Sequence, residues 1–166
     1  FGQEAQLKLK DASVLVIGAG GLGCPCLLYL AAAGVGHIGV ADHDFISLSN
    51  LQRQVLFDTA DIGKLKCEIA KEKLLQKNDC IKIDSYPTRI VKENALEIIM
   101  GYDLIIDGSD NFATSYLLND ACVILNKPFI YGSLFQYEGQ LSTFNYQGGP
   151  TLRCLFPQAP HETEIT

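Results

Sequence analysis

The sequence contains no tryptophan, one methionine and no long uninterrupted apolar run. Its longest apolar stretches, residues 13–22 and 27–35, are much shorter than the roughly 20 residues that span a bilayer. Basic residues are also scarce, because 13 Lys and Arg stand against 19 Asp and Glu for a net charge of −6. That balance disfavours a general attraction to nucleic acid or to an anionic membrane. No export signal is visible, and a cytoplasmic protein is expected.

The six cysteines lack the dense, regular spacing of a secreted disulfide scaffold, so reduced thiols are expected. Cys24 and Cys26 are too close together for the usual zinc clip and stand where an apolar helix begins, which favours packing over metal binding. With 48% hydrophobic and 19% charged residues, the 166-residue chain is expected to form one globular domain. A core of that size needs neither a disulfide nor a metal.

Apolar runs alternate with helical patterns along most of the chain. The predicted strands are residues 13–17, 37–41, 81–86, 103–107 and 129–132, and the predicted helices are 24–33, 62–76, 94–100 and 112–125. Asp61 is expected to cap the second helix. This alternation predicts an α/β fold, a Rossmann-like, largely parallel sheet with helices on both faces. Residues 141–146 alternate and favour an antiparallel extension at the C-terminal end; no further helix is expected, and 147–166 are predicted to be a loop-like tail.

A glycine cluster stands between the first predicted strand and helix. It has the pattern GxGxxG, and its glycines are Gly18, Gly20, Gly21 and Gly23. Asp42 ends the next predicted strand, about 20 residues further on. Glycines let the backbone approach phosphate oxygens, the helix N-terminus supplies free N–H groups, and a carboxylate at that place accepts hydrogen bonds from ribose hydroxyls. The pattern predicts a nucleotide-binding site without specifying the nucleotide.

A polar insertion, residues 47–54, follows the second predicted strand at the end of the sheet where ligands bind in such folds. A dinucleotide such as NAD has no need of Arg53 there, whereas a nucleoside triphosphate offers further negative charge for a guanidinium to hold. The alternative is a solvated loop in which Arg53 is incidental. His37 and His43 are expected to have surface or packing roles.

Five motifs occur in a fixed order: GAGGLGCP, the acidic pair Asp42 and Asp44, SNLQRQ, IGKLK and GSDN. Together they resemble the ThiF/MoeB/HesA-type adenylyltransferases, which are bacterial relatives of the ubiquitin-activating enzyme. The resemblance runs from residue 1 to about residue 157. It implies that residues 1–166 are a single nucleotide-binding domain of that family.

The resemblance implies an ATP-dependent enzyme that adenylates the C-terminal glycine carboxylate of a small ubiquitin-like sulfur-carrier protein and releases pyrophosphate. The carrier would end in Gly-Gly and serve molybdopterin or thiamine biosynthesis. The enzyme would be a homodimer. A carboxylate is already a competent nucleophile, so the site has to neutralise and align phosphates rather than supply a base.

By motif position, Arg53 and Lys66 would hold the polyphosphate and Asp110 would bind Mg²⁺. The family pattern Gly-x-x-Lys selects Lys66 over Lys64, and a lysine at a helix start suggests an anionic ligand. Further polar contacts to the nucleotide would come from Asp44, Asn50 and Gln54. Each has an alternative: Asp110 could cap the next helix, and the polar side chains could only order their loop.

Two departures from the family stand out. The first cysteine of the family's zinc-binding pair is replaced by Thr151, Cys154 remains alone, and the second pair is not in this chain, so no structural zinc is expected. The family's N-terminal arginine, crossover loop and later strands are also missing. A domain truncated at both ends, weakly active at best by itself, is therefore expected. Two other functions stay open, an NAD-dependent oxidoreductase using the same glycine motif and a pseudo-enzyme that binds the carrier without activating it.

Overall fold

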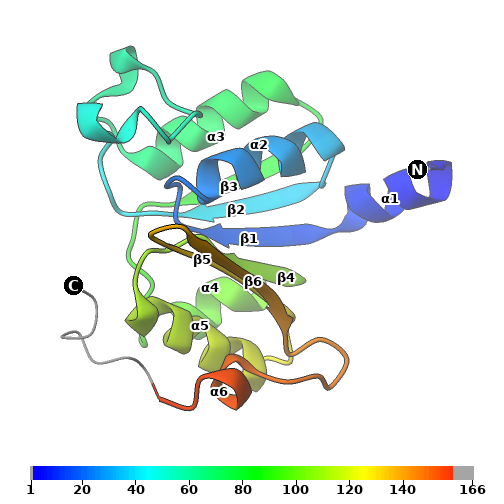
Figure 1. The fold of residues 1–166 in the computed structure, drawn as a ribbon. Coiled ribbons are helices and arrows are strands. Elements are labelled where there is room, and N and C mark those ends of the chain that lie inside the picture. The colour runs from blue at the N-terminus through cyan, green and yellow to red at the C-terminus, as the bar shows by residue number, and fades with distance from the viewer. Residues whose placement is uncertain (1, 159–166) are drawn as a thin grey trace.

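The computed structural model describes residues 2–158 and contains one six-stranded sheet. The strand order is β3-β2-β1-β4-β5-β6, with the first five parallel and β6 antiparallel to β5. The strands are β1 (Ser13–Ile17), β2 (His37–Ala41), β3 (Lys82–Tyr86), β4 (Leu104–Asp107), β5 (Phe129–Phe135) and β6 (Glu138–Phe144). The predicted α/β fold with its antiparallel extension is confirmed (Figure 1).

Helices cover both faces of this sheet. They are α1 (Gln3–Asp11), α2 (Gly23–Ala33), α3 (Lys66–Lys77), α4 (Ala95–Met100), α5 (Phe112–Ile124) and α6 (Leu152–Leu155), with short 3₁₀ turns η1 (Leu48–Asn50) and η2 (Thr59–Asp61). Figure 1 shows α2 and α3 above the sheet and α4 and α5 below it. Among the helices of residues 2–158, none is long and apolar enough to cross a membrane.

The central strand β1 explains why the sequence shows continuous apolar runs rather than alternation. Val14 and Val16 belong to the core cluster under α2 and α3, whereas Leu15 and Ile17 belong to the cluster under α4 and α5. Successive side chains of a strand point to opposite faces, so a strand covered on both faces must be apolar throughout. The same arrangement buries four of the five residues of β2 and two of the four residues of β4.

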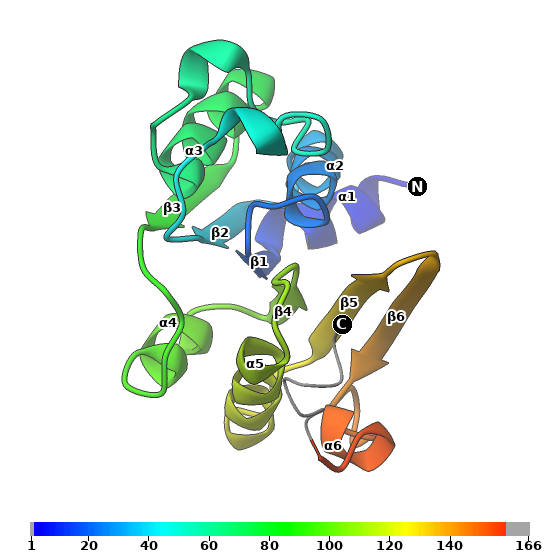
Figure 2. The same cartoon turned by 60° about the vertical axis from the view of Figure 1, so that its left-hand side comes forward.

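The carboxyl ends of β1, β2 and β4 meet at one edge of the sheet. Ile17 is in register with Ala41 of β2 and with Asp107 of β4. The residues that follow these strands therefore lie side by side, as the turned view in Figure 2 shows. The segment that follows β2, residues 42–65, arches over this edge before α3 begins.

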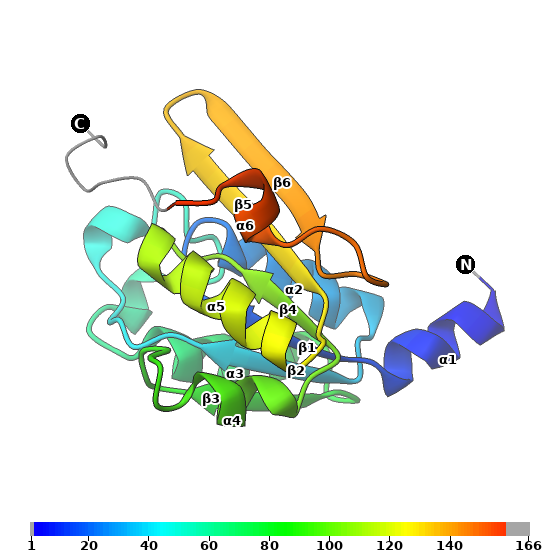
Figure 3. The same ribbon diagram turned by 90° about the horizontal axis from the view of Figure 1, so that it is seen from below.

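Four sequence expectations are wrong. The second predicted helix starts at Lys66 rather than at residue 62, and Asp61 is the last residue of η2, where it forms a capping box with Asp58; Leu65 is the N-cap of α3. A further helix, α6, does follow β6 within the predicted tail. The hairpin strands are 129–135 and 138–144 instead of 129–132 and 141–146, and they project as one long hairpin in Figure 3. The part of the tail from 159 to 166 lies outside the described residues.

The N-terminal helix α1 was not predicted at all. It buries none of its residues and projects beyond the sheet (Figure 3). It is tied to the turn after α2 by a hydrogen bond from Gly36 N to Leu9 O (3.0 Å) and by one from Gln6 Nε2 to Ala33 O (2.9 Å). A helix without a buried stripe leaves no periodic apolar pattern in the sequence.

Candidate nucleotide-binding site

The glycine loop between β1 and α2 is shaped by two close backbone approaches. Gly18 has φ +89°, and a Cβ there would lie 2.7 Å from Gly108 O. A Cβ on Gly23 would lie 1.8 Å from Gly18 O, so no larger residue fits at the start of α2. The loop thus leads straight into a helix N-terminus, where free N–H groups and the helix dipole favour an anion.

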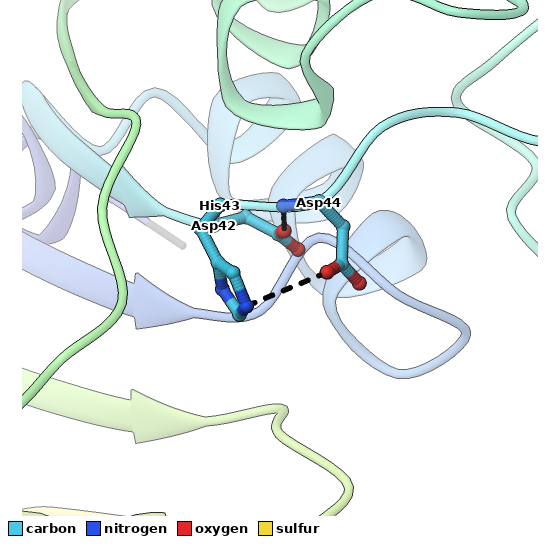
Figure 4. A group of neighbouring side chains, drawn as sticks. All are labelled: Asp42, His43 and Asp44. Atoms are coloured by element: carbon cyan, nitrogen blue, oxygen red, sulfur yellow. Dashed lines mark hydrogen bonds and ion pairs between the residues drawn. The ribbon is translucent and has the colours of Figure 1, made fainter.

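Asp42, at the end of β2, is buried and ties two loops together. Its Oδ2 accepts a hydrogen bond from Ala19 N (2.7 Å) and its Oδ1 accepts one from Asp44 N (2.8 Å). Figure 4 shows this turn. Each carboxylate oxygen has two acceptor sites, so Asp42 retains capacity for a further donor such as a hydroxyl.

Lys66 is a buried cation at the first residue of α3. Its side chain is 6% exposed, and its Nζ donates a hydrogen bond to Asp44 Oδ2 at 2.8 Å. That hydrogen bond holds the pKa of Asp44 below its ordinary value, against the smaller effect of partial burial. Lys64, the alternative, is exposed and lies 3.5 Å from Asp61 Oδ1, directed to η2 instead. The structure therefore separates the two lysines as the Gly-x-x-Lys pattern does.

Arg53 and Gln54 both lie over the glycine loop. The Arg53 Cδ is 3.3 Å from the place a Cβ on Gly21 would take, and the Gln54 Nε2 is 3.9 Å from that of Gly20. Arg53 is exposed, so its guanidinium is free to meet a ligand. Gln54 is only 2% exposed, and its Oε1 is one of two buried side-chain atoms in residues 2–158 that lack a hydrogen-bond partner.

Asn50 shapes the turn that presents these two residues. Its side-chain Oδ1 accepts a hydrogen bond from Ser47 Oγ (2.8 Å), and its backbone O accepts hydrogen bonds from the N–H groups of Arg53 and Gln54. These contacts match the structural alternative for Asn50. They also fix the backbone position from which the Arg53 side chain extends.

Asp110 lies on the other side of the glycine loop, in the segment that follows β4. It is exposed, and it does not cap α5, because Asn111 is the N-cap and accepts the Thr114 N–H at 2.9 Å. The capping alternative for Asp110 is therefore wrong. The neighbouring Gly108 makes the contact with Gly18 described above, so this segment borders the glycine loop.

Asp107, the last residue of β4, escaped the sequence analysis. It is 2% exposed, and its Oδ1 accepts hydrogen bonds from Ser109 N (2.9 Å) and Ser109 Oγ (2.7 Å). Burial raises its pKa, opposed by the two hydrogen bonds from Ser109. The signal available in the sequence was an acidic residue at the end of an otherwise apolar strand.

One group of side chains in the site has the composition of a metal centre. Asp42, His43 and Asp44 bring one ligand atom each to within 4.8 Å of one another, and His43 Nε2 lies 3.6 Å from Asp44 Oδ1 (Figure 4). The Lys66 ammonium already pairs with Asp44, and both oxygens of Asp42 accept backbone N–H groups. The group therefore fits a cation poorly, whereas Asp110 has a free, exposed carboxylate.

The cysteines agree with the packing interpretation. Cys24 is buried in the core, its Sγ donates to Ala19 O (3.2 Å), and burial raises the pKa of its thiol to about 11. All six cysteines are free. Thr151 and Cys154 face each other at the start of α6, with the hydroxyl 3.4 Å from the thiol sulfur.

The fold is a Rossmann-like domain in which Arg53 lies over the glycine loop and the buried Lys66 pairs with Asp44. The chain belongs to the ThiF family, whose profile matches residues 1–166. It is 51% identical over its whole length to "Adenylyltransferase and sulfurtransferase MOCS3" of Culex quinquefasciatus and covers 38% of that protein. It is 49% identical to "Sulfur carrier protein adenylyltransferase" of Thermus thermophilus, with 96% of this chain and 60% of the relative covered.

A red-algal relative, "Probable molybdopterin-synthase adenylyltransferase" of Porphyra purpurea, is 55% identical over 90% of this chain and 39% of its own length. Among solved structures, E. coli MccB with MccA-N7isoASN superimposes with a TM-score of 0.83 at 29% identity, covering 96% of this chain and 48% of MccB. E. coli MccB with ATP gives a TM-score of 0.72 at 36% identity, covering 76% and 38%. The chain thus spans less than two thirds of these relatives.

Proposed function

We propose that the protein containing this chain is an adenylyltransferase that uses ATP to adenylate the C-terminal glycine carboxylate of a small ubiquitin-like sulfur-carrier protein. The printed names of the mosquito, bacterial and algal relatives support this activity. The observation that carries it is the cationic pair at the glycine loop, Arg53 over Gly21 and buried Lys66 beside Asp44. Two cations at that place suit a triphosphate.

The reaction follows from the charges that the site can balance. A carboxylate oxygen of the carrier attacks the α-phosphorus of ATP, the bond from that phosphorus to the bridging oxygen breaks, and pyrophosphate leaves with the electron pair. The product is an acyl-adenylate, and no proton has to be removed. The chain has to align the phosphates and to neutralise charge on the leaving pyrophosphate, and the positions of Arg53 over Gly21 and of Lys66 beside Asp44 support this role for the two side chains.

Asp110 would hold Mg²⁺. Its carboxylate is exposed on the segment that borders Gly18, and hard oxygen ligands of this kind suit the ion. When bound, Mg²⁺ supplies neutralisation of phosphate charge. Asp42 would accept the ribose hydroxyls through its remaining acceptor sites, while Asp44, Asn50 and Gln54 complete the polar wall of the site.

The partner would be a carrier with a Gly-Gly end, in molybdopterin or thiamine biosynthesis, and the enzyme would be a cytoplasmic homodimer without structural zinc. Thr151 beside Cys154 supports the last point, since a hydroxyl replaces a thiolate ligand. Light scattering of the full-length protein and metal analysis test these two proposals. A monomer, or one equivalent of zinc, would contradict them.

An ATP–pyrophosphate exchange assay on the full-length protein tests the activity, using as acceptors the sulfur carriers encoded in the same genome. Exchange that depends on a carrier, and that falls at least about 100-fold in Arg53→Ala and Asp110→Ala, is expected. An NAD-dependent oxidoreductase would bind NAD tightly and give no exchange. A pseudo-enzyme would bind the carrier and also give none.

A further inference from the structure

The glycine loop is flanked by two buried acceptor atoms that the protein leaves unpaired. Among residues 2–158, Gln54 Oε1 and Asp107 Oδ2 are the buried side-chain atoms with no hydrogen-bond partner. Gln54 lies over Gly20 on the β2 side, and Asp107 ends β4 on the other side. Buried polar groups are nearly always paired, so a buried carboxyl kept at this edge calls for a reason.

Asp107 fastens the segment that carries Asp110. With one oxygen it accepts both the N–H and the hydroxyl of Ser109, which fixes the backbone two residues ahead. The same segment is held against β1 by the hydrogen bond from Gly108 N to Ile17 O (2.8 Å), and Gly108 in turn makes the close approach to Gly18. One buried side chain therefore sets the path of residues 108–110 along the glycine loop.

We propose that Asp107 is a positioning residue that holds the 108–111 segment so that Asp110 faces the phosphates of a bound nucleotide. This inference rests on the proposed ATP-binding function. The hydrogen bonds of Asp107 go to Ser109, so its effect acts through Ser109 and Asp110.

The opposite end of the same strand offers a matched control. Asp103 precedes β4 and accepts hydrogen bonds from Ser13 N (2.9 Å) and Ser13 Oγ (2.6 Å), the same pair of donors that Ser109 gives to Asp107. Asp103→Ala removes two hydrogen bonds from the same kinds of donor, made by an exposed carboxylate at the edge of the sheet away from the site. A general loss of stability would therefore affect both variants, and a positioning role would affect only Asp107.

The test measures binding of the ATP analogue AMPCPP to the full-length protein by calorimetry, with and without Mg²⁺, and amide exchange of residues 108–111 in the unliganded protein. Asp107→Ala is expected to speed exchange there and to raise the dissociation constant with Mg²⁺ by about tenfold. Asp107→Asn, which keeps an acceptor for Ser109, is expected to restore binding to within about threefold. Asp103→Ala is expected to leave both measurements unchanged.

Equal effects of Asp107→Ala and Asp103→Ala would overturn the inference, and so would unchanged binding in Asp107→Ala. If Asp107→Ala does not fold, Ser109→Ala decides, since it removes only the hydroxyl bond. A rise of about threefold supports the role and no change overturns it. Wild-type protein that binds no AMPCPP would overturn the proposed function as well, which distinguishes the two failures.

Discussion

At the scale of single residues, the burial of Lys66 and its pairing with Asp44 support its proposed role in holding phosphate. A buried ammonium with one exposed carboxylate partner is free to exchange that partner for a phosphate, because Asp44 can turn to water when the ligand arrives. Lys66 is also the first residue of α3, and the helix dipole disfavours a cation at the N-terminal end. Both observations point to an anion that stabilises the arrangement.

Lys66→Met is therefore expected to lower carrier-dependent pyrophosphate exchange by about 100-fold, while the apolar stem of the side chain preserves packing. Lys64→Met is the control, since Lys64 is exposed and lies beside Asp61, and its loss should change exchange by less than about threefold. Equal losses in the two variants would contradict the assignment.

Two glycines of the loop allow packing and ligand approach to be separated. A Cβ on Gly20 would meet only Gln54 Nε2 at 3.9 Å, an ordinary contact, whereas one on Gly23 would lie 1.8 Å from Gly18 O. The free energy of unfolding of Gly20→Ala is expected to lie within about 1 kcal/mol of the wild-type value. The same variant is expected to bind ATP at least about tenfold more weakly. Gly23→Ala should lower the free energy of unfolding several-fold more than Gly20→Ala does. Urea unfolding and calorimetry measure both, and tight ATP binding by Gly20→Ala would contradict the loop's role.

At the scale of elements, an ion cluster fastens the arching segment 42–65 to α3. Lys73 of α3 contacts Asp58 and lies 2.7 Å from Asp61 Oδ2, and both acids belong to the capping box of η2. Burial raises the pKa of Asp61, but hydrogen bonds from Lys73 and from Asp58 N outweigh it and leave the pKa lowered. Arg53 precedes this cluster in the sequence, and Lys66 lies between its acids and Lys73. The cluster therefore holds the segment that carries Arg53 against the helix that carries Lys66.

Lys73→Met is expected to reduce the free energy of unfolding at pH 7 by about 1–3 kcal/mol. Because the folded pKa of Asp61 is below its unfolded value, the lost contribution is fully present above the ordinary Asp pKa of about 3.9 and fades as pH falls through the folded value. Urea unfolding from pH 7 to pH 3 should therefore show the two proteins converging. Lys77→Met, exposed at the end of α3, is the control, and a difference independent of pH would contradict the ion cluster.

The elements also show where sequence patterns succeed and where they stop. Strands β1, β2 and β4 were predictable because both of their faces are buried, and α2 because Pro25 and Gly34 bound an apolar run. Helices α1 and α6 were missed because the first buries no residue and the second has four residues. Asp61 was misassigned because an Asp carboxylate accepts backbone N–H groups in a 3₁₀ turn just as it does at a helix N-cap.

The candidate site divides in the same way. The glycine loop and the neighbouring Asp42 were predictable from local motifs, because the close backbone approaches at Gly18 and Gly23 admit only glycine. Asp107 was not, since its role arises from the pairing of β4 with β1, which sets Asp107 in register with Ile17 and brings Gly108 against Gly18 although the segments are far apart in sequence. A contact between segments far apart in sequence produces no motif with a fixed residue spacing.

At the scale of the whole molecule, one sheet with a core on each face buries three of the six thiols. Cys24 and Cys67 are buried with pKa values raised to about 11, and Cys122 to about 12, mainly by burial. Thiolates react, so these three should resist modification while the protein is folded. The exposed thiols belong to Cys80 and Cys154.

Those two exposed cysteines are expected to differ in reactivity. Hydrogen bonds from Thr151 lower the pKa of Cys154, whereas the Asp79 carboxylate raises that of Cys80. Iodoacetamide at pH 7.5, with each site followed by mass spectrometry, should therefore label Cys154 several-fold faster than Cys80. Thr151→Val removes the hydroxyl and should slow Cys154 alone. Labelling of Cys24 or Cys122 in the folded protein as fast as Cys154 would contradict the two-sided core, because it would require the sheet to open on the timescale of the reaction.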